Sequence, residues 1–251
     1  MNQPRSHAPG STGVSIGVVI AAAGSGNRFA AGNVGAAESI PKQWLPLRGV
    51  PLIAYSFRFF DRWDVVSQIA VALDASSATR PERLAFVESQ FGKKVYVAVG
   101  GASRQESVWA ALRRFDPIPD IAMVHDAARP FPPLDAIERA IGVAREKGGA
   151  ILAGRLVETV KKVNDRMEIV ETLDRSCLWR AQTPQIFRGA ELVRAYRSQE
   201  RRLSEFTDDA SIFESAGGTV CVVESPESNF KVTLPEDFVR AERLLAARDK
   251  K

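Results

Sequence analysis

Cysteine and histidine are scarce in this chain, with two of each among 251 residues. Cys177 and Cys221 do not have the close spacing of metal ligands or of a Cys-x-x-Cys pair. We therefore expect two reduced thiols in a cytoplasmic protein. No stretch reaches the roughly 18 consecutive apolar residues of a transmembrane helix. These absences argue against a disulfide scaffold, a zinc site and a membrane protein.

Long runs of one charge are also missing. The chain has 34 Lys and Arg against 30 Asp and Glu, a formal net charge of +4 and a pI near 9.2. This spread predicts a charged surface with an anion pocket and no nucleic-acid partner. Residues 1–13 are polar and lack the apolar core of a signal peptide, so they predict a disordered leader. Residues 14–251 are enough for one large domain.

The first apolar run, over residues 16–23, leads into a glycine turn. It has the length and composition of a buried strand. Gly24 and Gly26 let the backbone turn sharply and bring N–H groups close to an anion. Arg28 and Lys42 place two cations near the same loop. A strand, a glycine turn and two cations predict a phosphate-binding site.

Common nucleotide-binding templates do not fit this turn. Phe29 stands where the dinucleotide fingerprint has its third glycine, and no Walker sequence follows. The turn could also be a plain connection from strand to helix. With Pro41-Lys42-Gln43 it resembles the signature of sugar-phosphate nucleotidyltransferases. The insert between Arg28 and Pro41 is either a lid over the site or a surface insertion.

The rest of the chain alternates apolar runs with amphipathic segments, which predicts a Rossmann-like α/β fold: a mostly parallel twisted sheet flanked by helices. The expected strands are 16–23, 65–74, 95–99, 121–124, 150–153 and 220–223. The expected helices cover 51–60, 81–91 and 190–202, with one more ending at 147 and one beginning at 235. Residues 159–164 and 169–173 alternate around a polar turn and predict a projecting β-hairpin arm at about 155–180.

Polar residues follow two later strands of the expected sheet. Gly100 and Gly101 end one strand, and their loop could bind a nucleotide base at the sheet edge where ligands bind in open α/β folds. Arg104 and Ser107, further along, could belong to this binding loop, or they could be helix-capping or surface residues. Asp126 ends the next strand, where a carboxylate is well placed to hold Mg²⁺ beside phosphates, although it could also cap a turn.

The neighbours of Asp126 receive different interpretations. Arg129 could grip a phosphate with two hydrogen bonds. His125 is interpreted as a structural residue rather than a catalytic one.

In Thr207-Asp208-Asp209-Ala210-Ser211 the acidic residues suit a helix N-terminus, so Asp209 is assigned to capping.

Seven segments in this order carry a resemblance: GSGNR, PKQWLPL, GGASRQESV, HDAARP, TPQIF, TDDAS and NFKVTLPED. Together they resemble the 2-C-methyl-D-erythritol 4-phosphate cytidylyltransferases of the non-mevalonate isoprenoid pathway. The resemblance implies transfer of a cytidylyl group from CTP to 2-C-methyl-D-erythritol 4-phosphate, with release of pyrophosphate. It also implies a homodimer in which the arm clasps the second subunit.

Residue roles follow from the same resemblance. It makes Arg28 and Lys42 catalytic and Asp126 the Mg²⁺ ligand. The acceptor phosphate would be bound by Arg129 and Lys231, with Thr159 and Arg175 reaching the partner's site. The implied CTP-binding residues are Ala22, Ala23, Gly24, Gly26, Gly100, Gly101, Ser107 and Ala127.

Three alternatives stay open. A ribitol-5-phosphate cytidylyltransferase shares most motifs, but the HDAAR form favours methylerythritol phosphate. A dinucleotide-dependent oxidoreductase would need the third glycine that Phe29 replaces. A nucleotide-binding protein without catalysis would have no need for both Arg28 and Lys42.

Arg155 and Val157 stand where the family often has proline and arginine, which leaves the geometry of the arm open.

Overall fold

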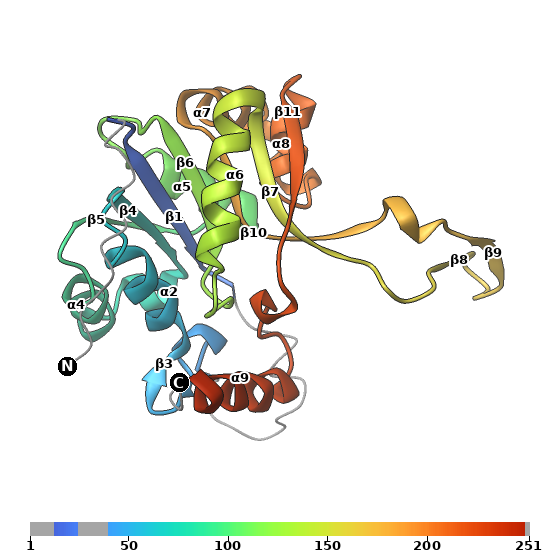
Figure 1. Ribbon diagram of the computed structural model, residues 1–251. Helices are drawn as coiled ribbons and strands as arrows, with labels where there is room; N and C mark the ends of the chain where they lie inside the picture. Colours follow the sequence, from blue (N-terminus) through green and yellow to red (C-terminus); the bar gives the residue numbers. More distant parts are fainter. Residues whose placement is uncertain (1–12, 25–39, 249–251) are drawn as a thin grey trace.

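A twisted seven-stranded sheet forms the centre of the molecule in the computed structural model, which describes residues 13–24 and 40–248 (Figure 1). The strand order is β11-β7-β10-β6-β1-β4-β5. Only β10 runs antiparallel to its neighbours β6 and β7. The predicted Rossmann-like, mostly parallel sheet is therefore confirmed. Its strands are β1 (Ile16–Ala22), β4 (Val66–Leu73), β5 (Lys94–Val99), β6 (Ile121–Asp126), β7 (Gly148–Arg155), β10 (Trp179–Arg188) and β11 (Thr219–Glu224).

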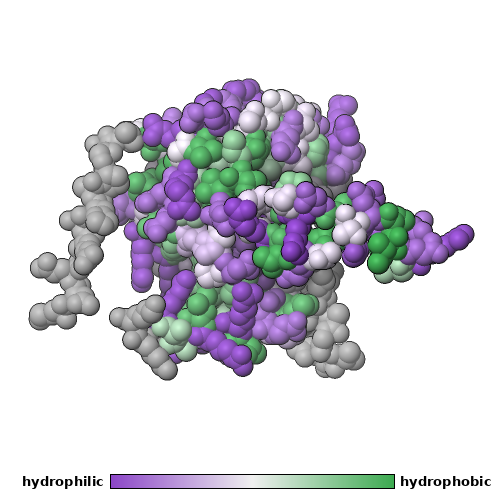
Figure 2. Space-filling model, turned by 45° about the vertical axis from the view of Figure 1, so that its right-hand side comes forward, coloured by the Kyte–Doolittle hydropathy of each residue, from purple (hydrophilic) through white to green (hydrophobic). Residues whose placement is uncertain are grey.

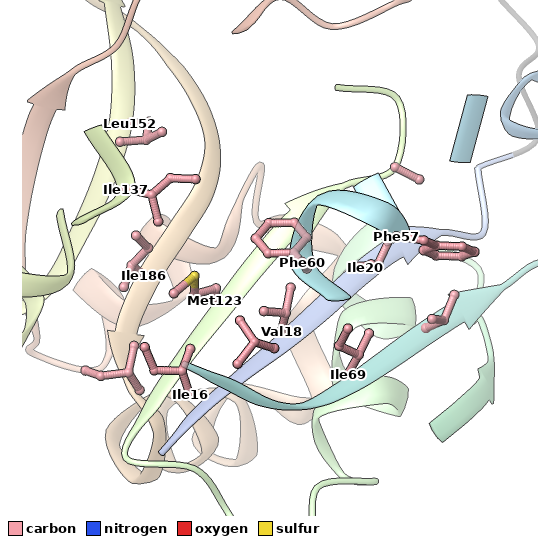
Figure 3. Close-up of a cluster of buried hydrophobic side chains, with 14 of the residues drawn as sticks. Ile16, Val18, Ile20, Phe57, Phe60, Ile69, Met123, Ile137, Leu152 and Ile186 are labelled. Atoms are coloured by element: carbon pink, nitrogen blue, oxygen red, sulfur yellow. The ribbon is translucent and has the colours of Figure 1, made fainter. Parts of the chain in front are cut away.

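Helices cover both faces of the sheet because successive side chains of a strand point to opposite faces. In β1, Val18 and Ile20 pack into the core under α2, α4 and α6, whereas Val19 packs into the core under α5, α7 and α8. Figure 3 shows Phe57 and Phe60 of α2 lying over the β1 side chains of the first core. These helices are α2 (Leu52–Asp61), α4 (Pro81–Ser89), α5 (Arg104–Leu112), α6 (Leu134–Lys147), α7 (Gly189–Ser198) and α8 (Asp209–Ser215).

A third, smaller core lies beside the main sheet, where Leu47, Phe131 and Val232 pack under the closing helix α9 (Pro235–Arg248). The remaining elements are short. They are η1 (Lys42–Trp44), β2 (Pro46–Leu47), β3 (Val50–Pro51), α3 (Ala75–Ala78), η2 (Arg175–Cys177), η3 (Glu200–Glu205) and η4 (Glu227–Asn229). In the part of the chain that the structure describes, no helix combines the length and the apolar character that a membrane crossing needs.

One strand of the sheet was not anticipated from the sequence. β10 fills the position between β6 and β7, although residues 179–188 carry Pro184 in their interior. Proline removes a ladder hydrogen bond and normally argues against a central strand. Here the register of β10 against β7 shifts between Ala181 and Gln185, so the strand accommodates the proline at an irregularity. The predicted helix over 190–202 ends earlier, at Ser198, and continues as η3.

The hairpin arm is present as predicted. Its strands β8 (Lys161–Val163) and β9 (Ile169–Thr172) form a separate two-stranded ribbon. Figure 1 shows this ribbon projecting well away from the sheet on two long connections. All residues of both strands are exposed in the single chain. A two-stranded ribbon is marginally stable alone, and within the single chain these strands bury no residue against the rest of the molecule.

Candidate active site

A pocket of about 610 Å³ opens at the carboxyl ends of β1 and β6. Pockets of this size suit a nucleotide, and this edge of an open α/β sheet is where ligands bind. Among the described residues, its lining contains three cations, Lys42, Arg104 and Lys231, and a single carboxylate, that of Asp126. The excess of positive charge identifies an anion site.

The pocket gathers most of the predicted nucleotide-binding residues. The predicted CTP-binding residues that line it are Ala22, Ala23, Gly24, Gly101, Ser107 and Ala127, and the predicted catalytic Lys42, metal ligand Asp126 and acceptor-binding Lys231 line it too. Gln43, Ala102, Ser103, Arg104, Ala128 and Thr233 also line it and were not predicted as ligand contacts. Gly26, Arg28 and the insert up to residue 39 lie outside the described residues, so their roles stay predictions.

Gly100 lets two loops of the pocket approach closely. Its N–H donates to the carbonyl of Leu73, at 2.7 Å. A Cβ atom at Gly100 would lie 2.3 Å from Cβ of Ala23 and 2.8 Å from Oγ of Ser107. Ser107 in turn accepts a hydrogen bond from the N–H of Gly101. Gly100 therefore shapes the pocket from behind, although it is not among the residues that line it.

Lys42 enters the pocket from η1, and the other two residues of η1 bind it to the rest of the domain. Gln43 donates to the carbonyl of Ala22 at 2.7 Å, and Trp44 donates to Oγ of Ser77 at 2.9 Å. Lys42 itself donates to the carbonyl of Val232 at 2.5 Å. These contacts hold Lys42 among the residues that line the pocket together with Gly24, whereas the rest of the predicted glycine turn lies outside the described residues.

Asp126 is the electrostatic centre of the pocket. Its Oδ1 accepts from Nε of Arg104 at 2.9 Å, and its Oδ2 accepts from Nζ of Lys231 at 2.8 Å. Burial alone would raise the pKa of this carboxyl, but the charges of Arg104, Lys231 and Arg129 hold the pKa well below its usual range. Asp126 is therefore a carboxylate near neutral pH.

One expectation from the sequence is wrong at this point, and one alternative that the sequence left open is excluded. Asp209 does not cap α8: the capping box is made by Asp208 and Ser211, while Asp209 is fully buried and pairs with Arg104. Arg104 is neither a cap nor a surface charge, because Ser103 caps α5 with Glu106 and the Arg104 side chain points inward. One carboxylate suffices to cap a helix, so the second aspartate of TDDAS was the available sign that one of the two has another role.

His125 is structural, as expected. Its Nε2 lies 3.0 Å from the carbonyl of Arg129, and Oγ1 of Thr183 lies 3.2 Å from its Nδ1. The same hydroxyl accepts from the N–H of Asp126. Thr183 can thus donate to Nδ1 only when that nitrogen is unprotonated, and burial lowers the pKa of His125 to about 4. A neutral His125 fixes the backbone on both sides of Asp126.

Arg129 lies behind the pocket in this structure. Its side chain is buried and its Nη1 donates to the carbonyl of Asn229 at 2.8 Å. Nε lies 3.9 Å from Oδ2 of Asp126, which is a long ion pair. Arg129 is not among the pocket-lining residues, so its direct contact with a phosphate stays a prediction.

A divalent cation would find one protein carboxylate here. Among the described residues there is no cluster of three or more His, Cys, Asp or Glu that could hold a metal by itself. Mg²⁺ usually takes one or two carboxylates and completes its shell with substrate phosphates and water. Asp126 fits that role if Lys231, whose side chain is 37% exposed, moves off Oδ2.

The arm brings its two predicted site residues together, away from the pocket of the same chain. Nη1 of Arg175 donates to the carbonyl of Val157 at 2.6 Å and lies 3.5 Å from Oγ1 of Thr159. Arg155 pairs with Glu224 at 3.1 Å and stacks on Trp179 at the base of the arm. Figure 2 shows apolar surface on the projecting arm.

Comparison with known proteins agrees with this geometry. The family model described as "2-C-methyl-D-erythritol 4-phosphate cytidylyltransferase" matches residues 16–247. The chain is 38% identical to the protein of that name from Symbiobacterium thermophilum, covering 92% of this chain and 93% of the relative. It is 34% identical to the one from Alkaliphilus oremlandii, covering 92% and 95%.

Solved structures give the same result. The 2-C-methyl-D-erythritol 4-phosphate cytidylyltransferase of Francisella tularensis superposes with a TM-score of 0.73 at 30% identity, over 91% of this chain and 99% of that one. The enzyme of that name from Thermus thermophilus gives 0.71 at 28% identity, over 91% and 98%. The chain belongs to the 2-C-methyl-D-erythritol 4-phosphate cytidylyltransferase family.

Proposed function

We propose that the pocket around Asp126 is where this chain carries out the reaction of its family. The chain transfers the cytidylyl group of CTP to 2-C-methyl-D-erythritol 4-phosphate in isoprenoid biosynthesis. The observation that carries the assignment is the convergence of Lys42, Arg104 and Lys231 on a pocket at the carboxyl ends of the strands, whose described lining residues include one carboxylate. We further propose that the protein works in the cytoplasm.

The chemistry requires charge neutralisation more than proton transfer. A phosphate oxygen of the acceptor attacks the α-phosphorus of CTP, and the bond from that phosphorus to the bridging oxygen breaks to release pyrophosphate. Both reactants are anions, and the acceptor oxygen is already ionised near pH 7. Fixed cations that screen the repulsion and stabilise the crowded transition state therefore supply the catalysis.

Each described cation has a position suited to one part of this task. Lys42, which lines the pocket together with Gly24, neutralises charge on the triphosphate. Lys231 moves from Asp126 to the acceptor phosphate. Arg28 acts with Lys42, and Ser107 with Gly101 lines the end of the pocket that takes the base.

Asp126 would hold Mg²⁺ together with oxygens of CTP. The cation, when bound, neutralises phosphate charge and polarises the α-phosphorus. Oδ2 is the oxygen available for this contact, because Oδ1 stays with Arg104.

The arm supports a homodimer. Large apolar side chains are exposed along it and around its base in the single chain: Val157, Val163, Met167, Ile169 and Val170. Surface of this kind marks a contact region. In the proposed dimer the arm carries Thr159 and Arg175 to the acceptor end of the partner's pocket.

Mixed dimers test both the pocket and the arm. We would combine a subunit carrying Lys42→Ala with a subunit carrying Arg175→Ala, each inactive as a homodimer. If the arm acts on the partner's pocket, mixing restores activity, because one site of each mixed dimer has an intact pocket and an intact arm. Activity that stays at the level of the separate variants would contradict the proposed use of the arm.

A further inference from the structure

A line of buried polar contacts leads from the pocket into the core between α5, α7 and α8. Oη of Tyr196 lies 2.5 Å from Oδ1 of Asp209, and Oδ2 of Asp209 lies 3.0 Å from Nη1 of Arg104. Nε of Arg104 donates to Oδ1 of Asp126 at 2.9 Å. Asp209 and Tyr196 are both fully buried, and neither lines the pocket.

The fold alone does not explain Asp209. The start of α8 is already capped by Asp208, whose carboxylate accepts from the N–H of Ser211. A charged carboxylate in the core is costly unless it is paired, and burial raises the pKa of Asp209. Its partners are Arg104 and Tyr196. A buried acid whose cation reaches the pocket indicates a role in the site.

Arg104 needs a fixed partner when the nucleotide is bound. Its side chain is 25% exposed, and it lines the pocket that takes the triphosphate. Without a counter-charge behind it, the guanidinium would be drawn toward the phosphates and away from Asp126. Asp209 supplies that counter-charge from the core, and the Tyr196 hydroxyl holds the Asp209 carboxylate in place.

We propose that Asp209 and Tyr196 are positioning residues that act through Arg104 to fix Oδ1 of Asp126, so that Asp126 presents only Oδ2 to the pocket. The inference rests on the proposed role of Asp126. It gives the two oxygens of Asp126 different tasks: Oδ1 is held by a cation anchored in the core, and Oδ2 is exchanged between the partly exposed Lys231 and a divalent cation bound with CTP.

Adjacent aspartates provide a matched test. Asp209→Asn removes the buried charge, whereas Asp208→Asn changes the neighbouring carboxylate and keeps an oxygen for the cap. We would measure kcat, and separately the affinity of the CTP complex for Mn²⁺ by electron paramagnetic resonance. Loss of an outer-shell partner commonly weakens metal binding by about 10- to 100-fold. We expect Asp209→Asn to lose at least about 10-fold in both quantities, and Asp208→Asn to stay within about twofold.

Tyr196→Phe covers the case in which Asp209→Asn fails to fold, since it removes one hydroxyl and keeps the ring stacked on Trp109. We expect a loss of about 2- to 10-fold in Mn²⁺ affinity, as for one hydrogen bond. Unchanged kcat and Mn²⁺ affinity in the folded variants would overturn the proposal, and so would an equal loss in Asp208→Asn. Asp126→Asn separates the proposed metal-binding role of Asp126 from the positioning role of Asp209 and Tyr196. Retained Mn²⁺ affinity in that variant would refute the role of Asp126 itself.

Discussion

Nζ of Lys231 lies 2.8 Å from Oδ2 of Asp126, across 105 residues of sequence, on the rim of the pocket. The Lys231 side chain is 37% exposed, whereas that of Asp126 is 10% exposed and is also held by Arg104. The lysine is thus the partner that can leave. This pair is best understood as a contact that substrate replaces rather than as a support of the fold.

Replacing Lys231 should therefore affect activity much more than stability. In Lys231→Met we expect kcat/KM for methylerythritol phosphate to fall roughly 100-fold, because the acceptor loses a charge-assisted contact. The free energy of unfolding should change by about 1 kcal/mol or less, since the pair is partly exposed. Denaturant unfolding and initial rates measure the two effects. Lys147→Met, which breaks an exposed pair with Glu146, is the control and should leave activity unchanged. A loss of stability without a loss of activity would refute this interpretation.

Lys42 should be required for the chemical step. Lys42→Met removes one of the cations that line the pocket, and we expect kcat to fall roughly 10²- to 10³-fold. Lys93→Met is the matched control, because Lys93 also donates to main-chain carbonyls, those of Phe60 and Trp63, but lies outside the pocket. It should keep its turnover. Single-turnover kinetics would measure the step directly, and near-normal rates in Lys42→Met would remove this residue from the mechanism.

Gly100 should tolerate no side chain. In Gly100→Ala the new Cβ atom would overlap Ala23 and Ser107, so the loops that form the nucleotide pocket must separate. We expect a raised KM for CTP and a lower melting temperature. Gly142→Ala provides the contrast: it lies within α6, and nothing is within 4 Å of its added Cβ. That variant should gain about 0.5–1 kcal/mol from helix propensity. Equal stability of the two variants would show that the contact at Gly100 is not tight.

Acid should weaken the fold through His125. Its pKa is about 4 in the folded protein against 6.5 for an ordinary histidine, so the unfolded chain binds a proton that the folded protein excludes. Stability is then lost as the pH falls from about 6.5 to 4, by about 3 kcal/mol in total. In His125→Gln this part of the pH dependence should disappear. The raised pKa of Asp209 acts in the opposite direction, but it is common to both proteins and cancels in the comparison. Parallel curves of unfolding free energy against pH for the two proteins would contradict this assignment.

Local sequence patterns were sufficient for much of the site. The strand β1 and the carboxylate at the end of β6 each depend on a few consecutive residues, and both were predicted. The arm was recognisable for the same reason, because alternation on both sides of a polar turn is typical of a hairpin. Arg28 and Gly26 lie outside the described residues and stay predictions.

Long-range pairing was beyond the sequence patterns. Nothing near Asp209 indicates that it meets Arg104, since the two residues are brought together only when α8 packs beside α5. Local chemistry favoured capping, and the neighbouring Asp208 is in fact the cap. β10 was missed because Pro184 contradicts a central strand, and only the shifted register against β7 makes it possible. Tertiary contacts overrode a sound local rule in both cases.

Pyrophosphate release by the purified protein with CTP and Mg²⁺ is the most direct test of the proposed cytidylyl transfer. Three reactions would be compared: one with 2-C-methyl-D-erythritol 4-phosphate, one with ribitol 5-phosphate and one without acceptor. We expect release with methylerythritol phosphate alone. Release with ribitol phosphate alone would keep the chemistry of the pocket and contradict the acceptor, and no release in any reaction would contradict the assignment of the pocket as a cytidylyltransferase site.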